Sequence, residues 1–95
     1  MSASGSNPVI MWTDVNSSHI VRVAYVAETH RLGIEFRSGA FFAYEDVPLD
    51  VYYGLIGAQS VGQYFDRVVK KTGLYDYERF LSKEGLENKL LHQRP

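Results

Sequence analysis

The segment Leu32–Tyr44, LGIEFRSGAFFAY, constrains the fold more than any other part of the sequence. Its apolar residues fall at every second position from 32 to 36, which is the period-two pattern of a β-strand with one buried face. Ser38-Gly39 then supplies turn residues, and an aromatic-rich stretch returns from position 40 to 44. The segment therefore predicts a β-hairpin.

The length of the hairpin loop decides which face of the sheet carries Phe42 and Tyr44. A two-residue loop at 38–39 places both rings on the polar face, as an open aromatic platform. A three-residue loop at 37–39, closed by Gly39 in the left-handed region, turns both rings toward the core, because a one-residue slip moves every side chain to the other face. A two-residue type I′ turn needs positive φ at both positions, which serine tolerates poorly. We therefore favour the three-residue loop.

Two segments before the hairpin also have strand patterns. The stretch 19–27, HIVRVAYVA, is rich in β-branched residues. Alternation divides it into a face of Val21, Val23 and Tyr25 and a face of Ile20, Arg22 and Ala24. A short apolar run within 8–15 predicts an extra edge strand. Short connections between sequential strands indicate an antiparallel meander.

Helical patterns follow the hairpin. Pro48 suits the first turn of a short helix over 49–58, since the N–H it lacks would have no helical partner there. Ser60 is a good N-cap for a second helix. Apolar residues at 61, 64, 65, 68 and 69 form one buried stripe of that helix, and Gly73 ends it. Tyr77, Phe80 and the leucines from 81 to 91 also have helical spacing.

Together these patterns predict an α+β fold. It consists of a three-stranded antiparallel meander, with an optional N-terminal edge strand, covered by two or more helices in the order strand–strand–strand–helix–helix. Residues 1–8 are expected to be a flexible tail and residues 9–73 the folded domain. Residues 74–95 are expected to form a helical C-terminal extension, which packs on the same chain or on a second subunit.

Composition limits the classes of function. The chain has 95 residues and no cysteine, so it holds one small domain without disulfides or thiolate chemistry. Apolar runs are too short to span a membrane, and the N-terminus lacks a signal-peptide pattern, so we expect a cytoplasmic protein. The net charge of −1 argues against strong non-specific nucleic-acid binding. Residues 61–95 are nevertheless mildly basic, with seven basic and five acidic side chains.

The stretch from Val15 to about Val69 resembles the KTSC domain, a module found at the C-terminus of some lysyl-tRNA synthetases and in stand-alone bacterial or phage proteins. The residues that carry the resemblance include Ser17, Ser18, Phe36, Gly39, Phe42, Tyr44, Pro48, Tyr52, Tyr64 and Phe65. The family pattern has Tyr-x-Tyr where this chain has Phe42-Ala43-Tyr44, and Asn where it has Asp66. The resemblance implies that residues 9–73 form a KTSC-like domain, and the synthetase context implies RNA binding.

Catalytic and metal-binding patterns are weak. His19 follows Ser17 and Ser18, but neighbouring residues on an extended strand point to opposite faces, so the imidazole does not naturally reach the hydroxyls. The three histidines lack the spacing of metal ligands. We therefore predict a non-enzymatic protein with no catalytic residues, metal or cofactor.

Two binding functions are left open. In the first, surface aromatics and cations bind RNA or a nucleotide-type ligand. Its candidate residues are Arg22, Tyr25, Arg37, Phe41, Tyr44, Arg67, Lys70 and Lys71. In the second, the chain is a protein-interaction or self-assembling module, with a homo-oligomer formed through residues 74–95. A phage protein that sequesters a host signalling molecule between subunits would combine the two.

Overall fold

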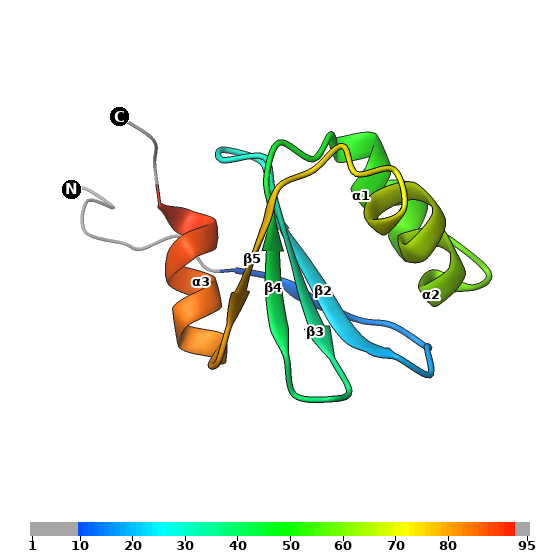
Figure 1. The fold of residues 1–95 in the computed structure, drawn as a ribbon, viewed down its shortest axis with the longest axis horizontal. Helices are drawn as coiled ribbons and strands as arrows, with labels where there is room; N and C mark the ends of the chain where they lie inside the picture. Colours follow the sequence, from blue (N-terminus) through cyan, green and yellow to red (C-terminus); the bar gives the residue numbers. More distant parts are fainter. Residues whose placement is uncertain (1–9, 93–95) are drawn as a thin grey trace.

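Five antiparallel strands form one sheet in chain order (Figure 1). The structure, a computed structural model, describes residues 10–92, so the predicted tail over 1–8 lies outside the described residues. The strands are β1 (Trp12–Asp14), β2 (Ile20–Val26), β3 (Arg31–Phe36), β4 (Phe41–Tyr44) and β5 (Tyr77–Phe80). The predicted edge strand is thus present as β1, and β5 extends the sheet at its other edge.

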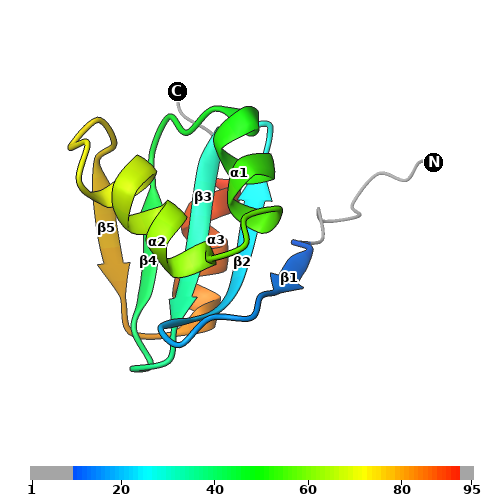
Figure 2. The same cartoon turned by 90° about the vertical axis from the view of Figure 1, so that its right-hand side faces the viewer.

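Helices cover both faces of the sheet. They are α1 (Leu49–Ile56), α2 (Val61–Tyr64), the π-helix η1 (Phe65–Lys70) that continues α2, and α3 (Lys83–Leu91). Figures 1 and 2 show α1 and α2 on one face and α3 on the opposite face, so the domain has three layers. No helix within residues 10–92 is long and apolar enough to cross a membrane.

The hairpin has the predicted three-residue loop. The Phe36 N–H donates to the Ala40 carbonyl at 2.9 Å, and the Gly39 N–H donates to the Phe36 carbonyl at 2.9 Å. Gly39 has φ 93°, which a residue with a Cβ rarely adopts. Beyond the loop, Phe42 pairs with Ile34 and Tyr44 with Leu32. Both rings therefore belong to the α1–α2 side of the sheet, as the three-residue loop predicts.

A β-bulge in β2 corrects the predicted division of that strand. The register between β2 and β3 shifts between Ile20 and Arg22, which leaves Val21 as the extra residue. Ile20 consequently joins Val23 in the core beneath α1 and α2, although alternation placed it with Arg22 and Ala24. The extra residue reverses the face to which side chains on either side of it point, so simple alternation fails there.

Each face of the sheet has its own apolar core. Beneath α1 and α2 lies a large cluster made of Ile20, Val23, Leu32, Ile34, Tyr44, Val47, Leu55, Val61, Phe65 and Val69. The α3 side has a smaller cluster of Ala24, Val26, Ala43, Leu86 and Leu90. Small residues predominate on the sheet side of this second cluster, which lets α3 approach closely. Gly33 is one of them, because a Cβ there would lie 2.8 Å from the Leu90 Cδ1 atom.

The predicted three-stranded meander with a wholly helical extension is wrong. Residues 77–80 form β5, which pairs with β4 and places Tyr77 opposite Tyr44. The spacing of Tyr77 and Phe80 fitted a helix, but pairing with the free edge of β4 satisfies the backbone as a strand. Gly73, at φ 65°, turns the chain between the end of η1 at Lys70 and β5. The Ser82 hydroxyl caps α3 by accepting from the Gly85 N–H at 3.0 Å.

Buried polar contacts hold the C-terminal end of α3 in place. Arg31 is only 2% exposed. Its guanidinium donates to Glu45 Oε1 at 2.8 Å, to the Lys89 carbonyl at 2.7 Å and to the His92 carbonyl. A cation at this end also complements the helix dipole. Residues 83–92 therefore pack on their own chain, where Leu86 and Leu90 are fully buried.

Truncation of Leu90 tests this packing. We expect Leu90→Ala to lower the free energy of unfolding by about 2–5 kcal/mol, because it leaves a cavity between α3 and the sheet. Leu81→Ala, at a side chain that is 89% exposed, is the matched control and should change stability by less than about 0.5 kcal/mol. Urea denaturation measures both. Equal, small effects for the two variants would show that α3 does not dock on the sheet.

Candidate functional site

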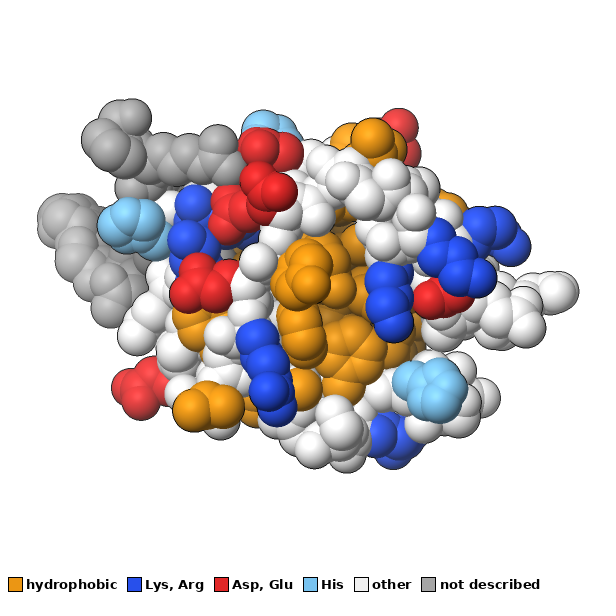
Figure 3. Space-filling view, viewed as in Figure 1, with side chains coloured by type: hydrophobic (Ala, Val, Ile, Leu, Met, Phe, Trp, Pro, Cys, Tyr) orange, Lys and Arg blue, Asp and Glu red, His pale blue; other side chains and the backbone are white. Residues whose placement is uncertain are grey.

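A groove lined by aromatic rings opens between β4–β5 and the η1 helix. Its volume is about 850 Å³. The rings that line it are those of Phe36, Phe42, Tyr44, Phe65, Tyr75 and Tyr77. Figure 3 shows this apolar surface at the centre of one face of the molecule, with Lys and Arg side chains on both sides of it. We call it the aromatic groove.

The rings of the aromatic groove contact one another in a continuous cluster. Phe42 lies 5.5 Å from Phe36 and 5.6 Å from Tyr77, measured between ring centroids. Tyr44 lies 5.5 Å from both Phe65 and Tyr77. Such distances are typical of favourable aromatic pairs. Most of the cluster is core, but Tyr77 is 63% exposed and presents ring surface to solvent.

Tyr44 lies at the floor of the groove and is only 5% exposed. Burial, with a smaller contribution from Tyr77, raises the pKa of the Tyr44 phenol from 10.0 to about 12. Its hydroxyl is therefore neutral at physiological pH and acts as a hydrogen-bonding group, not as a charge.

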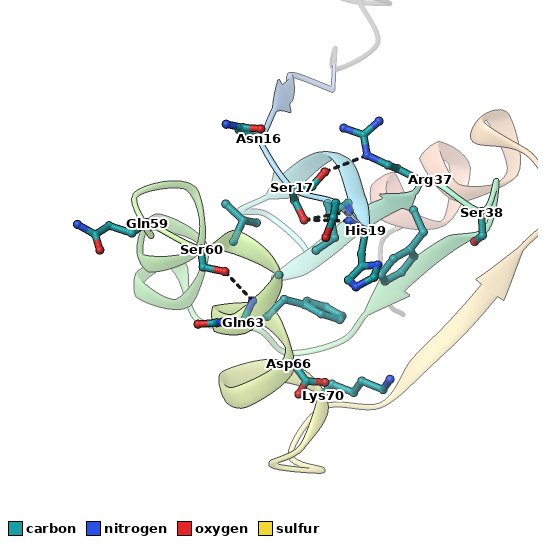
Figure 4. Close-up of a pocket in the computed structure, with 16 residues that line it drawn as sticks. Asn16, Ser17, His19, Arg37, Ser38, Gln59, Ser60, Gln63, Asp66 and Lys70 are labelled. Carbon is teal, nitrogen blue, oxygen red and sulfur yellow. Dashed lines mark hydrogen bonds between the residues drawn. The ribbon is translucent and has the colours of Figure 1, made fainter.

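A polar cleft of about 820 Å³ adjoins the aromatic groove. It lies between the β1–β2 loop, the tip of the β3–β4 hairpin and the start of α2, as Figure 4 shows. Its polar side chains are those of Asn16, Ser17, Ser18, His19, Arg37, Ser38, Gln59, Ser60, Gln63, Asp66 and Lys70. The cleft and the groove share Phe36, Ser38, Phe65 and Lys70, so they form one continuous surface.

Local hydrogen bonds shape the wall of the cleft. The Ser17 hydroxyl accepts from the backbone N–H groups of His19 and Ile20, each at 3.2 Å (Figure 4). This contact makes a tight turn, which is a common use of serine in loops. The Arg37 Nε atom donates to the Ser17 carbonyl at 2.9 Å and ties the hairpin tip to that turn. Gly62 lets α2 lie close to the β1–β2 loop, since a Cβ on Gly62 would be only 3.3 Å from Ser17 Oγ.

The π-helix η1 connects the two parts of the surface. Phe65 and Lys70 line both, while Asp66 lines the cleft and Val69 the groove. Sequence periodicity predicted an ordinary helix here and gave no sign of π geometry. Short π-helical turns occur frequently at functional sites, which supports the choice of this surface as the candidate site.

Several of the remaining motif residues build the support behind the site. Pro48 precedes α1 at its N-cap position. Tyr52 of α1 stacks on Tyr25, with ring centroids 5.3 Å apart. Gly54 allows the Tyr64 hydroxyl to approach α1, because a Cβ on Gly54 would overlap it. These contacts fix α1 and α2 against the sheet.

The structure brings together three of the predicted binding residues. Tyr44 and Lys70 line the aromatic groove, while Arg37 and Lys70 line the polar cleft. Lys70 is exposed and stands at the junction of the two.

The other five predicted binding residues lie outside this surface. The Tyr25 hydroxyl donates to the Val47 carbonyl at 2.5 Å, and its pKa is raised by burial and, less, by Asp50. Phe41 packs in the core beneath α3. Arg22 forms ion pairs with Asp14 at 3.5 Å and Glu35 at 3.3 Å, and Lys71 pairs with Asp66 at 3.2 Å. Arg67 is exposed on η1 and is not part of either wall.

Sequence reasoning missed Tyr77, Arg79 and Asp66. Tyr77 was assigned to a helical extension, so its pairing with Tyr44 was not visible. Arg79 pairs with Phe42 and projects on the same face of the sheet, next to the groove. Alternation within 77–80 was the signal that could have identified Tyr77 and Arg79 as strand residues on one face.

The groove and the cleft offer apolar, hydrogen-bonding and charged groups to a ligand. Rings, cations, hydroxyls, amides, the His19 imidazole and the carboxylates of Asp66 and Asp76 line this surface. The Ser17 hydroxyl is engaged with the backbone. Among residues 10–92, no three His, Cys, Asp or Glu side chains gather closely enough to hold a metal ion. The fold and this surface together define a small α+β domain with an aromatic groove beside a polar cleft.

Comparison with known proteins places this domain in a family. The KTSC domain profile matches residues 16–77, a segment that includes every residue lining the groove and the cleft. The chain belongs to the KTSC domain family, as the sequence resemblance predicted. A KTSC domain protein from Yersinia pestis has a similar crystal structure, with TM-score 0.70 and 28% identity over 76% of this chain and 99% of that one.

Relatives with similar sequences are of two kinds. An uncharacterised protein of Stutzerimonas stutzeri is 39% identical over 56 residues, which are 59% of this chain and 79% of that protein. The lysine–tRNA ligases of Trichormus variabilis and a Nostoc species are each 40% identical over 62 residues. That match covers 65% of this chain but only 11% of each ligase.

Ionisation of the Tyr44 phenol should lower the stability of the fold at alkaline pH. Because its pKa is higher in the folded state than the ordinary value of 10.0, its stabilising effect is present below pH 10 and is lost as the pH rises toward about 12. We expect Tyr44→Phe to lose less stability than the parent over that range. Chemical denaturation at a series of alkaline pH values measures this. Parallel losses in the two proteins would mean that Tyr44 is not buried.

Proposed function

We propose that the combined surface binds single-stranded RNA or a nucleotide-type ligand. A base stacks on the exposed ring of Tyr77 in the aromatic groove, and a phosphate lies near Lys70 at the junction with the polar cleft. Stacking on aromatic side chains and charge from Lys or Arg are the means by which proteins bind unpaired bases.

The observation that carries this proposal is the position of Tyr77. Its ring is 63% exposed although it contacts Phe42 and Tyr44 from behind. These contacts restrict the ring, so less conformational entropy is lost when a base stacks on it than for an isolated side chain. Lys70 lines the same groove, and Arg79 projects beside Phe42.

Local charge compensates for the charge of the whole chain. The net charge is −1, which gives little long-range attraction for a polyanion. The surface itself is slightly positive, because Arg37, Lys70 and Arg79 lie along or beside it and only Asp66 and Asp76 among its lining residues are acidic. We therefore expect modest affinity that depends on a short stretch of ligand. Two relatives are named lysine–tRNA ligase, and RNA is accordingly the first ligand class to test.

Replacing Tyr77 tests the stacking surface. We expect Tyr77→Leu to weaken binding of a fluorescent single-stranded RNA hexamer by about 1–3 kcal/mol, because leucine fills similar space but offers no ring face. Tyr53→Leu is the matched control, since Tyr53 is 60% exposed on α1, outside the groove. Fluorescence anisotropy measures both affinities. Equal affinities for the two variants would rule out the groove as the RNA site.

Two neighbouring lysines test the position of the phosphate. Lys70 lines the groove, whereas Lys71 pairs with Asp66 and lies outside both walls. We expect Lys70→Ala to lower the affinity and to reduce the slope of log K against log salt by about 0.7, the value for one phosphate contact on a single strand. Lys71→Ala should leave the slope close to that of the parent. A smaller slope in Lys71→Ala than in Lys70→Ala would contradict this assignment.

A second candidate is a protein-interaction module that self-associates through residues 74–95. Three exposed apolar side chains favour it, since Leu74, Tyr77 and Leu81 are 73%, 63% and 89% exposed and lie within or beside β5. This edge strand could pair with another strand, although its central Glu78 and Arg79 disfavour symmetric pairing of two copies. A phage protein that sequesters a host signalling molecule between subunits would use the same edge. RNA affinity at background level in the experiments above would favour this candidate.

A further inference from the structure

The proposed contacts with a base and a phosphate leave the polar cleft, and the His19 ring within it, without a role. His19 is exposed, and its imidazole lines the cleft between the β3–β4 hairpin and the helix formed by α2 and η1 (Figure 4). The hydrogen bonds that His19 makes within residues 10–92 all belong to its backbone. The imidazole is therefore available to a ligand.

The backbone of His19 is held from two sides. Its N–H donates to the Ser17 hydroxyl oxygen at 3.2 Å, and its carbonyl accepts from the Arg37 N–H at 2.8 Å. These bonds set the position of the ring beside the hairpin tip before a ligand binds, which lowers the entropic cost of a contact. Histidine is one of the side chains on which proteins stack unpaired RNA bases.

The position of Lys70 determines which ligand reaches this ring. Lys70 lines both the aromatic groove and the polar cleft, so a phosphate beside it has Tyr77 in the groove on one side and the cleft on the other. In a free mononucleotide the phosphate is the end of the molecule, and the cleft stays unused. In a strand the phosphate is a diester, so a second nucleoside follows it directly into the cleft.

The cleft has the size and the chemistry to hold a nucleoside. Its volume of about 820 Å³ is close to the groove's volume of about 850 Å³, and both values are typical of small-molecule sites. The Gln63 amide and the Ser18 hydroxyl line it, and each can donate to and accept from the polar edge of a base.

Charge in the cleft is also compatible with a strand. Arg37 lines the cleft, and its Nε atom donates to the Ser17 carbonyl at 2.9 Å. The terminal amino groups of this guanidinium have no hydrogen-bond partner among residues 10–92, so they can meet the phosphate that follows the second nucleoside. Asp66 is the one acidic side chain among the lining residues, and it pairs with Lys71 at 3.2 Å.

We infer that the polar cleft is a second nucleoside subsite, in which a base stacks on His19. The ligand is then a phosphodiester-linked strand of at least two nucleotides, with one base on Tyr77, the linking phosphate beside Lys70 and the next base on His19. This inference rests on the proposed function, because it assigns the neighbouring nucleotide of the same ligand.

The test compares adenosine 5′-monophosphate with the dinucleoside phosphate adenylyl-(3′→5′)-adenosine, each titrated into the full chain by calorimetry. The dinucleoside carries less negative charge, so charge alone would favour the monophosphate. We expect the parent to bind the dinucleoside roughly tenfold more tightly, which is within the range for one stacked base. His19→Ala should remove this preference without changing the affinity for the monophosphate. His19→Phe keeps a ring and should retain most of the preference.

His92→Ala is the matched control, because His92 is exposed after α3 and lines neither the groove nor the cleft. It should leave the preference unchanged. Equal affinities of the parent for the two ligands, a preference that survives in His19→Ala, or one that is lost in His19→Phe would overturn the inference. Binding of the RNA hexamer that still depends on Tyr77 would show that the proposed function stands. Binding of neither small ligand nor the hexamer would overturn both.

Discussion

The left-handed conformation of Gly39, at φ 93°, closes the β3–β4 hairpin through a three-residue loop and thereby sets the register of the central strands. A slip of one residue would turn Phe42 and Tyr44 toward α3, where Gly33 and Ala43 now leave room for Leu86 and Leu90. Those larger rings would separate α3 from the sheet, and the groove would lose its floor. The helical layers on both faces of the sheet therefore depend on this one turn.

The two faces of the sheet differ in how completely helices cover them. On the α3 side, small residues and the buried Arg31 fix a helix in place over the sheet. On the other side, α1 and α2 cover only part of the sheet, so the rings near β5 stay accessible. The KTSC match ends at Tyr77 and thus contains the groove but not α3. The family match therefore covers the groove and the cleft together with β2, β3, β4, α1, α2 and η1.

Local patterns in the sequence predicted the elements that local interactions determine. The hairpin loop, the Ser60 cap and the helices after Pro48 follow from turn and capping preferences, and the structure confirms them. The bulge at Val21 and the strand β5 could not be predicted in this way, because each depends on pairing with a distant strand. The binding residues were predicted only in part for the same reason. Tyr77 becomes a groove residue only when β5 pairs with β4, and Tyr25 loses that role when α1 covers it.

Chemical-shift mapping by NMR would test the central claim most directly, that the groove beside β5 and η1 is the binding surface. Titrating a single-stranded RNA hexamer into isotope-labelled protein should move the backbone signals of residues 36–44, 62–70 and 75–79. Signals of α3 should remain in place, because α3 packs on the face of the sheet opposite to the groove. Shifts concentrated on α3, or spread evenly over the surface, would contradict the account.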